Sequence, residues 1–235
     1  MELFTTSDGW QFLFRWMHFL AGITWIGMLY YFNFVQTPFF ATELGGQARS
    51  QVVRGLLPKA LWWFRWGAMF TIISGWAIIA LRHVQGVEFT DPYMTRILTG
   101  GLIGTIMWAN VWFVIWPIQQ KVIASAEAVA GGGEANPEAA ALAPKAANAS
   151  RTNTLLSIPM LFFMGSASFL ATFNNGTNDS TYWIVAGLVI LAVEWNGISA
   201  PGKPTQKLLA SVSGTIHGGL ILTVILYLVG VLLNS

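Results

Sequence analysis

WQFLFRWMHFLAGITWIGMLYYFNFVQ, residues 10–36, is the stretch that decides the fold. It is apolar over about the length that an α-helix needs to cross a bilayer. Arg15 and His18 interrupt it one helical turn apart, so they share a face. Ionisable groups are costly inside a membrane span, and this pair therefore marks a candidate functional site.

Gly22 and Trp25 continue the stripe that begins at His18, four and seven residues further on. A glycine one turn from a histidine leaves a gap beside the imidazole, which a porphyrin edge or a second helix can fill. The alternative is structural: Arg15 reaches the interface with its long side chain, and His18 bonds a neighbouring carbonyl. The sequence alone does not decide between these two interpretations.

The composition indicates an integral membrane protein. Hydrophobic residues make up 54% of the 235 residues and charged residues only 9%, whereas soluble domains carry roughly 25% charged residues. A net charge of +2 is too small to indicate nucleic-acid binding. Cysteine is absent, which excludes disulfides, thiolate metal sites, iron–sulfur clusters and covalent c-type haem. Any metal or haem must be held by His, Met or carboxylate ligands.

The apolar runs predict an all-α fold, a polytopic membrane bundle of about six transmembrane helices that forms a single membrane domain, residues 1–235. No cleavable signal peptide is expected. Residues 124–150 are rich in Ala and Gly and contain two prolines, which predicts a flexible cytoplasmic linker. The expected spans are residues 10–35, 58–81, 96–118, 152–173, 182–200 and 208–233.

The basic residues predict the orientation. Eight of them lie in the loops before the second, fourth and sixth spans, namely Arg49, Arg54, Lys59, Lys121, Lys145, Arg151, Lys203 and Lys207. The opposite loops hold only Arg82 and Arg96. By the positive-inside rule the first set is cytoplasmic, so both termini face outward. The expected location is the bacterial inner membrane.

Three histidines are candidate haem or metal ligands, because neutral imidazole is a common ligand of haem iron. His18 is the first choice, and the glycine-flanked His217 in the sixth span is either a second ligand or a packed histidine. His83, at the outer end of the second span, is the third. A ruler of about 1.5 Å per residue puts His18 and His217 at different depths. The second axial ligand is therefore left open.

Two further residues are candidate catalytic groups. Arg15 can pair with a haem propionate or an anionic substrate. Glu194 is the carboxylate inside the fifth span, where it can relay protons, weakly hold a metal, or pair with Arg65 of the second span. Walker, nucleophile-elbow and HExxH motifs are missing from the sequence, so ATPase and hydrolase chemistry has no support.

Two motifs carry a resemblance to a known family. The run HFLAGITWIGMLYYFNFVQ from His18, preceded by Arg15, and the run RTNTLLSIPMLFFMGSAS at 151–168 resemble the membrane domain of bacterial membrane-bound urate oxidases (urate hydroxylases). The resemblance implies urate oxidation with electrons passing to cytochrome c. That family often continues into a c-type cytochrome domain, so here a separate cytochrome c is the implied partner. The matching positions are Arg15, His18, Trp25, Asn33, Asn153 and Thr154.

Three hypotheses follow. The first is a haem-b redox enzyme that oxidises urate or a related small molecule. The second is a non-catalytic or electron-transfer subunit of a larger respiratory membrane complex. A transporter is a weaker third hypothesis, because no inverted repeat is visible.

Overall fold

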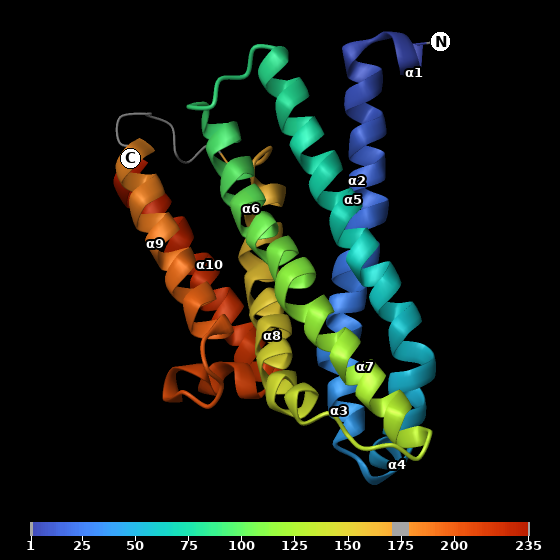
Figure 1. Ribbon diagram of the computed structural model, residues 1–235. Helices are drawn as coiled ribbons and strands as arrows, with labels where there is room; N and C mark the ends of the chain where they lie inside the picture. Colours follow the sequence, from blue (N-terminus) through green and yellow to red (C-terminus); the bar gives the residue numbers. More distant parts are fainter. Residues whose placement is uncertain (1, 171–178, 235) are drawn as a thin grey trace.

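The structure is a bundle of long helices that run side by side (Figure 1). It is a computed structural model and describes residues 2–170 and 179–234. Within these two ranges there is no strand. Five helical segments of this part are long and apolar enough to cross a membrane: Ser7–Phe40, Glu43–Val84, Pro92–Ala130, Ser180–Ile198 and Val212–Leu233. The predicted all-α, multi-pass membrane class is therefore confirmed.

Each of the first three segments is a continuous helix with a π-helical stretch inside it. The elements are α1 (Glu2–Thr5), α2 (Ser7–Tyr30), η1 (Tyr31–Gln36), α3 (Thr37–Phe40), α4 (Glu43–Gln51), η2 (Val52–Leu56), α5 (Leu57–Val84), α6 (Pro92–Ala109), η3 (Asn110–Ile115) and α7 (Trp116–Ala130). The chain continues through α8 (Pro137–Ser166), α9 (Asp179–Ile198), the 3-10 helix η4 (Pro204–Ala210) and α10 (Val212–Asn234).

Proline explains the three π-helical stretches. Pro38, Pro58 and Pro117 each lie two residues after the end of η1, η2 and η3, at the start of the α-helix that follows. A proline ring clashes with the carbonyl four residues earlier and removes one hydrogen bond of the helix. A locally wider turn relieves that clash without breaking the helix. The first three spans therefore continue past the ends that their apolar runs predict.

Most of the segment 124–150, which the sequence predicts to be a flexible linker, is helical in the structure. Helix α7 continues to Ala130 and α8 begins at Pro137, so both ends of this segment are helical. Alanine has the highest helix propensity of the residues, and the Asn136 side chain caps α8 by accepting a hydrogen bond from the Glu138 amide at 2.9 Å. Ala146 and Ala149 are buried. The alanine-rich composition therefore belongs to a packed helix.

Helix α8 occupies the place of the expected fourth span, 152–173, whose last three residues lie outside the described part. It is not among the five apolar segments, because it carries polar residues along its length. Thr152, Asn153, Thr154 and Ser157 are nevertheless at most 1% exposed. The other helices therefore shield the polar face of α8 from lipid, which satisfies the requirement that polar groups in a membrane find partners inside the protein.

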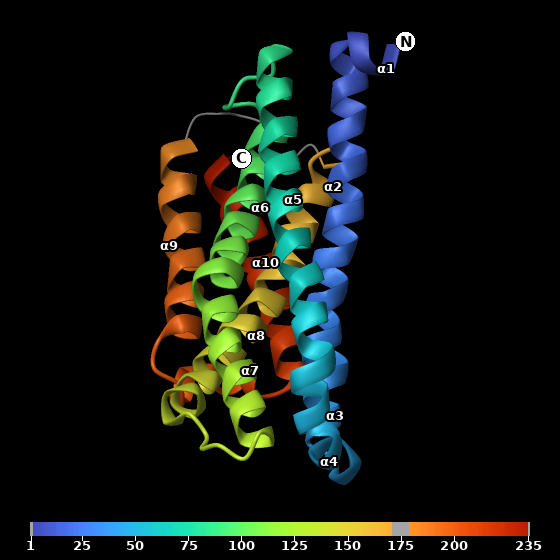
Figure 2. The same ribbon diagram turned by 45° about the vertical axis from the view of Figure 1, so that its right-hand side comes forward.

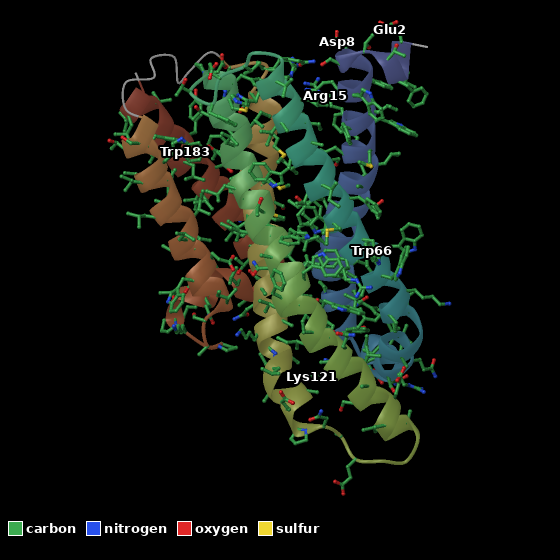
Figure 3. The ribbon with its side chains drawn as sticks, turned by 45° about the horizontal axis from the view of Figure 1, so that its top comes forward. Glu2, Asp8, Arg15, Trp66, Lys121 and Trp183 are labelled. Atoms are coloured by element: carbon green, nitrogen blue, oxygen red, sulfur yellow. The ribbon has the colours of Figure 1, made fainter. Side chains whose placement is uncertain are left out.

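The bundle has two ends of different character. The chain termini lie at one end, and α3, α4, the α7–α8 loop and the α9–α10 loop lie at the other (Figures 1 and 2). The three loops predicted to share one side of the membrane therefore do share one end of the bundle, which we call the basic end. Arg15 lies towards the opposite end of α2, and Lys121 lies near the basic end (Figure 3).

The helices pack as two pairs that meet near the basic end. In the first pair α2 and α5 approach closely, since a Cβ added at Gly67 would lie 3.1 Å from the Trp25 amide nitrogen. The second pair is α6 with α8, and α9 and α10 flank it (Figure 2). Trp25, Phe32 and Phe64 belong to one buried cluster that joins the pairs.

A candidate cofactor cavity

A cavity of about 620 Å³ lies between the two helix pairs. It lies between the buried cluster and the end of the bundle that carries the chain termini. Four helices line it: α2, α5, α6 and α8. The four residues predicted from the first span, Arg15, His18, Gly22 and Trp25, all lie on its wall. Its size is typical of sites for small molecules and cofactors. The four residues that helical spacing places on one stripe of α2 thus border the same cavity.

His18 is oriented by α5. Its Nδ1 lies 3.0 Å from the Thr71 carbonyl oxygen and 3.2 Å from Ser74 Oγ. The Ser74 hydroxyl donates to the Phe70 carbonyl at 2.6 Å, so it accepts from the imidazole. A carbonyl acceptor requires the proton on Nδ1, which leaves the Nε2 lone pair free. Ligating histidines are held in this way in metal and haem sites.

Glycine makes room for this arrangement. A Cβ added at Gly75 would lie 3.1 Å from His18 Cε1 and 3.3 Å from Nδ1. Any larger residue at position 75 must therefore push the imidazole away from Thr71. Gly22, Gly101 and Gly104 also line the cavity, where missing side chains widen the space between the helix pairs.

Arg15 is the cation of this cavity. Its side chain is partly buried on the cavity wall, and no carboxylate lies within ion-pair distance of it among the described side chains. A cation in a mainly apolar cavity is costly unless an anion accompanies it. The arrangement suits a ligand with an anionic group near the outer end of the cavity.

The other two histidines lie elsewhere. His217 is exposed on α10 and bonds its own helix, with Nδ1 2.7 Å from the Ser213 carbonyl oxygen. His83 is exposed at the end of α5, stacks on Phe89 and lies 3.2 Å from the Val87 carbonyl oxygen. Neither lines the cavity. The structure therefore does not bring His217 or His83 together with His18.

Glu194 belongs to a separate buried cluster between η3, α8 and α9. The Asn110 amide donates to Glu194 Oε2 at 3.0 Å and to Asn153 Oδ1 at 2.8 Å. The Asn153 amide in turn donates to the Met107 carbonyl at 2.9 Å. These three side chains are at most 8% exposed. The cluster ties three helices together through one carboxyl group.

The ion pair between Arg65 and Glu194 is absent among the described side chains, so that prediction is wrong. The Arg65 guanidinium lies 4.0 Å from the Trp116 ring centroid and 5.1 Å from that of Trp112. Aromatic faces attract a cation at such distances and offer it a partner in the absence of a carboxylate.

Replacing Glu194 with glutamine is expected to leave stability nearly unchanged, because the amide oxygen still accepts the bond from Asn110. Replacing it with alanine should cost about 1–3 kcal/mol, since the Asn110 donor then loses a buried partner. Unfolding by heat in detergent measures both. A glutamine variant as unstable as the alanine variant would show that the negative charge itself supports the fold.

Residues of the other cavity walls were not predicted. Thr71, Gly75, Tyr93, Met160 and Met164 come from three other helices. A signal existed for the methionines, because both lie in the second family-like motif, 151–168. The sequence contained no indication that this motif faces the first one across a cavity.

Fold and cavity together define a class: a multi-pass membrane bundle with a cofactor-sized, mainly apolar cavity and one oriented imidazole on its wall. The family model described as Urate oxidase N-terminal matches residues 88–197. The match runs from just before α6 to the last turn of α9 and contains the motif at 151–168. Over residues 88–197 the chain is therefore similar to the urate oxidase N-terminal family, in agreement with the resemblance seen in the motif at 151–168.

The match covers a little under half of the chain and does not extend to α2 or α5. It therefore includes the Met160 wall of the cavity but not the His18 wall. Comparisons with curated proteins and with solved structures gave no match.

Proposed function

We propose that this protein is a haem-b redox protein of the bacterial inner membrane that oxidises urate or a related small molecule. Electrons leave to a separate cytochrome c on the side of the chain termini. The observation that carries the proposal is the oriented His18 imidazole on the wall of a 620 Å³ cavity. The relation to the urate oxidase N-terminal family supports the choice of substrate.

The residues of the cavity fit haem b. His18 presents a free Nε2, which is the atom that ligates iron when Nδ1 is hydrogen-bonded. Arg15 supplies a positive charge for a propionate. The glycines of the four helices would leave room for a flat ring, and the mainly apolar lining would contact its faces.

Haem b supplies one-electron chemistry at its iron. His18 would be the first ligand, and the bonds of its Nδ1 to Thr71 and Ser74 would fix the ring and raise the basicity of Nε2. Met160 and Met164 lie on the facing helix α8 and carry the thioether groups that serve as ligands in other haem proteins. They are the candidates for the second ligand that the sequence left open.

The proposal is tested with the full chain purified in detergent. We expect a reduced-minus-oxidised spectrum with haem bands, and reduction of the haem when urate is added without oxygen. Absence of haem absorbance would end the proposal. Haem that dithionite reduces and urate does not would leave an electron-transfer role and remove the urate oxidation.

Enlarging Gly75 is expected to weaken haem binding. Valine at this position pushes the His18 ring away from its acceptors, and loss of such a supporting bond typically costs about 10–100-fold in affinity. Titration of haem-free protein with haemin measures the change. Gly46→Val is the control, because nothing lies within 4 Å of a Cβ at Gly46. Equal affinity of the Gly75→Val variant would contradict the role of Thr71 and Ser74.

A second candidate function is a non-catalytic or electron-transfer subunit of a larger respiratory complex. The exposed face of α2 favours it. In the most apolar 18-residue stretch of the first segment only 11% of the residues are buried, whereas in that of the third segment 44% are buried. Phe12, Trp16 and Leu20 are 52–59% exposed there and do not line the cavity. A partner helix on this face would cross-link to a cysteine introduced at Leu20, and an isolated, active monomer would argue against such a partner.

A further inference from the structure

A second, smaller pocket of about 300 Å³ lies at the basic end of the bundle. It is lined by η1 and α3, by Arg151 of α8, and by the junction of η4 with α10. Asn33 and His18 are about 15 residues apart along one continuous helix, which corresponds to about 22 Å. The pocket is therefore separate from the cavity of the proposed haem.

The two family-like motifs meet at this pocket. Asn33 belongs to the first motif and Arg151 opens the second, and both line the pocket. The Asn33 amide donates to Ser150 Oγ at 2.8 Å and to the Leu29 carbonyl at 2.9 Å. Both amide protons of Asn33 are thereby used, and the pocket wall is held in place by a bond between the two helices.

Arg151 is the one charged residue among the side chains that line the pocket, and the lining includes no carboxylate. Its guanidinium has neither a hydrogen bond nor an ion pair with the side chains or backbone of the described part. It is partly buried, where an unpaired cation carries a desolvation cost. The five donors of a guanidinium suit a carboxylate, a phosphate or a similar oxyanion.

The start of α10 agrees with an anionic ligand. Ser211 precedes α10 and Val212 is its first residue, and both line the pocket. Ser211 Oγ accepts a hydrogen bond from the Gly214 amide at 3.0 Å. The positive end of a helix dipole therefore adds to the charge of Arg151. Thr37 and Thr215 also line the pocket, but their hydroxyls donate to the Phe32 carbonyl at 2.8 Å and to the Ser211 carbonyl at 2.9 Å, so they offer no proton to an anion.

From this geometry we infer that the pocket at the basic end binds a small anionic group through Arg151. The group carries a carboxylate, a phosphate or the deprotonated ring of a small heterocycle. It comes either from a soluble anion or from the headgroup of an anionic phospholipid, because both can reach this end of the bundle. Binding here requires no redox step and no haem.

The experiment uses the full chain in detergent and two probes, urate and inorganic phosphate, each in equilibrium dialysis. Retained phospholipid is counted in parallel by native mass spectrometry after exchange into anionic or zwitterionic lipid. We expect R151Q to raise the Kd of a soluble probe by about tenfold, which is ~1.4 kcal/mol, or else to lose one retained anionic phospholipid. R151K keeps the charge and should keep most of the binding.

R54Q is the matched control, because it removes one positive charge from the same end of the bundle and Arg54 is exposed outside the pocket. If R151Q does not fold, A41W fills the pocket from its exposed side and is expected to lower binding by a similar factor. Equal binding of both probes and of phospholipid by wild type and by the folded variants would overturn the inference. These outcomes do not depend on the haem spectrum. The anion site can therefore be confirmed when the proposed redox function is rejected, and it can be rejected when that function is confirmed.

Discussion

Replacing His18 with alanine is expected to reduce bound haem to less than about a tenth of the wild-type content. The variant removes the imidazole whose Nδ1 is fixed by Thr71 and Ser74, and with it the free Nε2 that ligates iron in the proposed site. The pyridine haemochrome assay, expressed per mole of purified protein, measures the change. The fold should survive, because His18 is only partly buried.

Two matched variants separate this effect from a general loss of histidine. His217→Ala and His83→Ala each remove an exposed imidazole that bonds only nearby backbone or side chains of its own segment. Both variants are expected to keep the wild-type haem content. Loss of haem in His217→Ala with retention in His18→Ala would place the cofactor at α10 and reject the cavity.

Replacing Gly219 with alanine is expected to destabilise the protein by about 1–3 kcal/mol. An added Cβ would lie 2.5 Å from Ile158 Cδ1 and 2.7 Å from the Leu155 carbonyl oxygen. The carbonyl belongs to the backbone of α8, so α8 and α10 must separate to admit a methyl group. Unfolding of the purified variant in detergent, by heat or by increasing SDS, gives the change in free energy.

Gly187→Ala is the control for Gly219→Ala. Gly187 lies in the middle of α9, and nothing lies within 4 Å of a Cβ at that position. Alanine should there be neutral or stabilising by up to about 1 kcal/mol, because it has the higher helix propensity. A Gly219→Ala variant as stable as the Gly187→Ala variant would mean that α8 and α10 are not in close contact in the membrane.

The two observations behind the proposed function meet at the cavity rather than in one helix. The family match reaches the wall that carries Met160 and Met164. The oriented imidazole comes from α2, which the match does not cover. The proposed function therefore depends on how the α2–α5 pair packs against the α6–α8 pair. The haem spectra of the His18→Ala and Gly75→Val variants test the contribution of the first pair.

Composition was enough to predict the fold class, and helical spacing was enough to predict which side chains of the first span share a face. The low share of charged residues indicated a membrane protein, and the long apolar runs indicated a helical bundle. Within one helix, spacing decides which side chains share a face, so Arg15, His18, Gly22 and Trp25 could be placed together from their positions in the chain. The charge bias likewise grouped three loops, which the structure places at one end.

Which helix faces meet depends on tertiary packing. Spacing within a helix carries no information on its neighbours, so the contact of His18 with Thr71, the place of Arg65 beside Trp116 and the cluster around Glu194 were not predictable. His217 resembled His18 in its apolar, glycine-rich context, yet it faces outward because Gly218 and Gly219 occupy the buried side of α10. Packing between helices, rather than local sequence, assigned each polar group its partner.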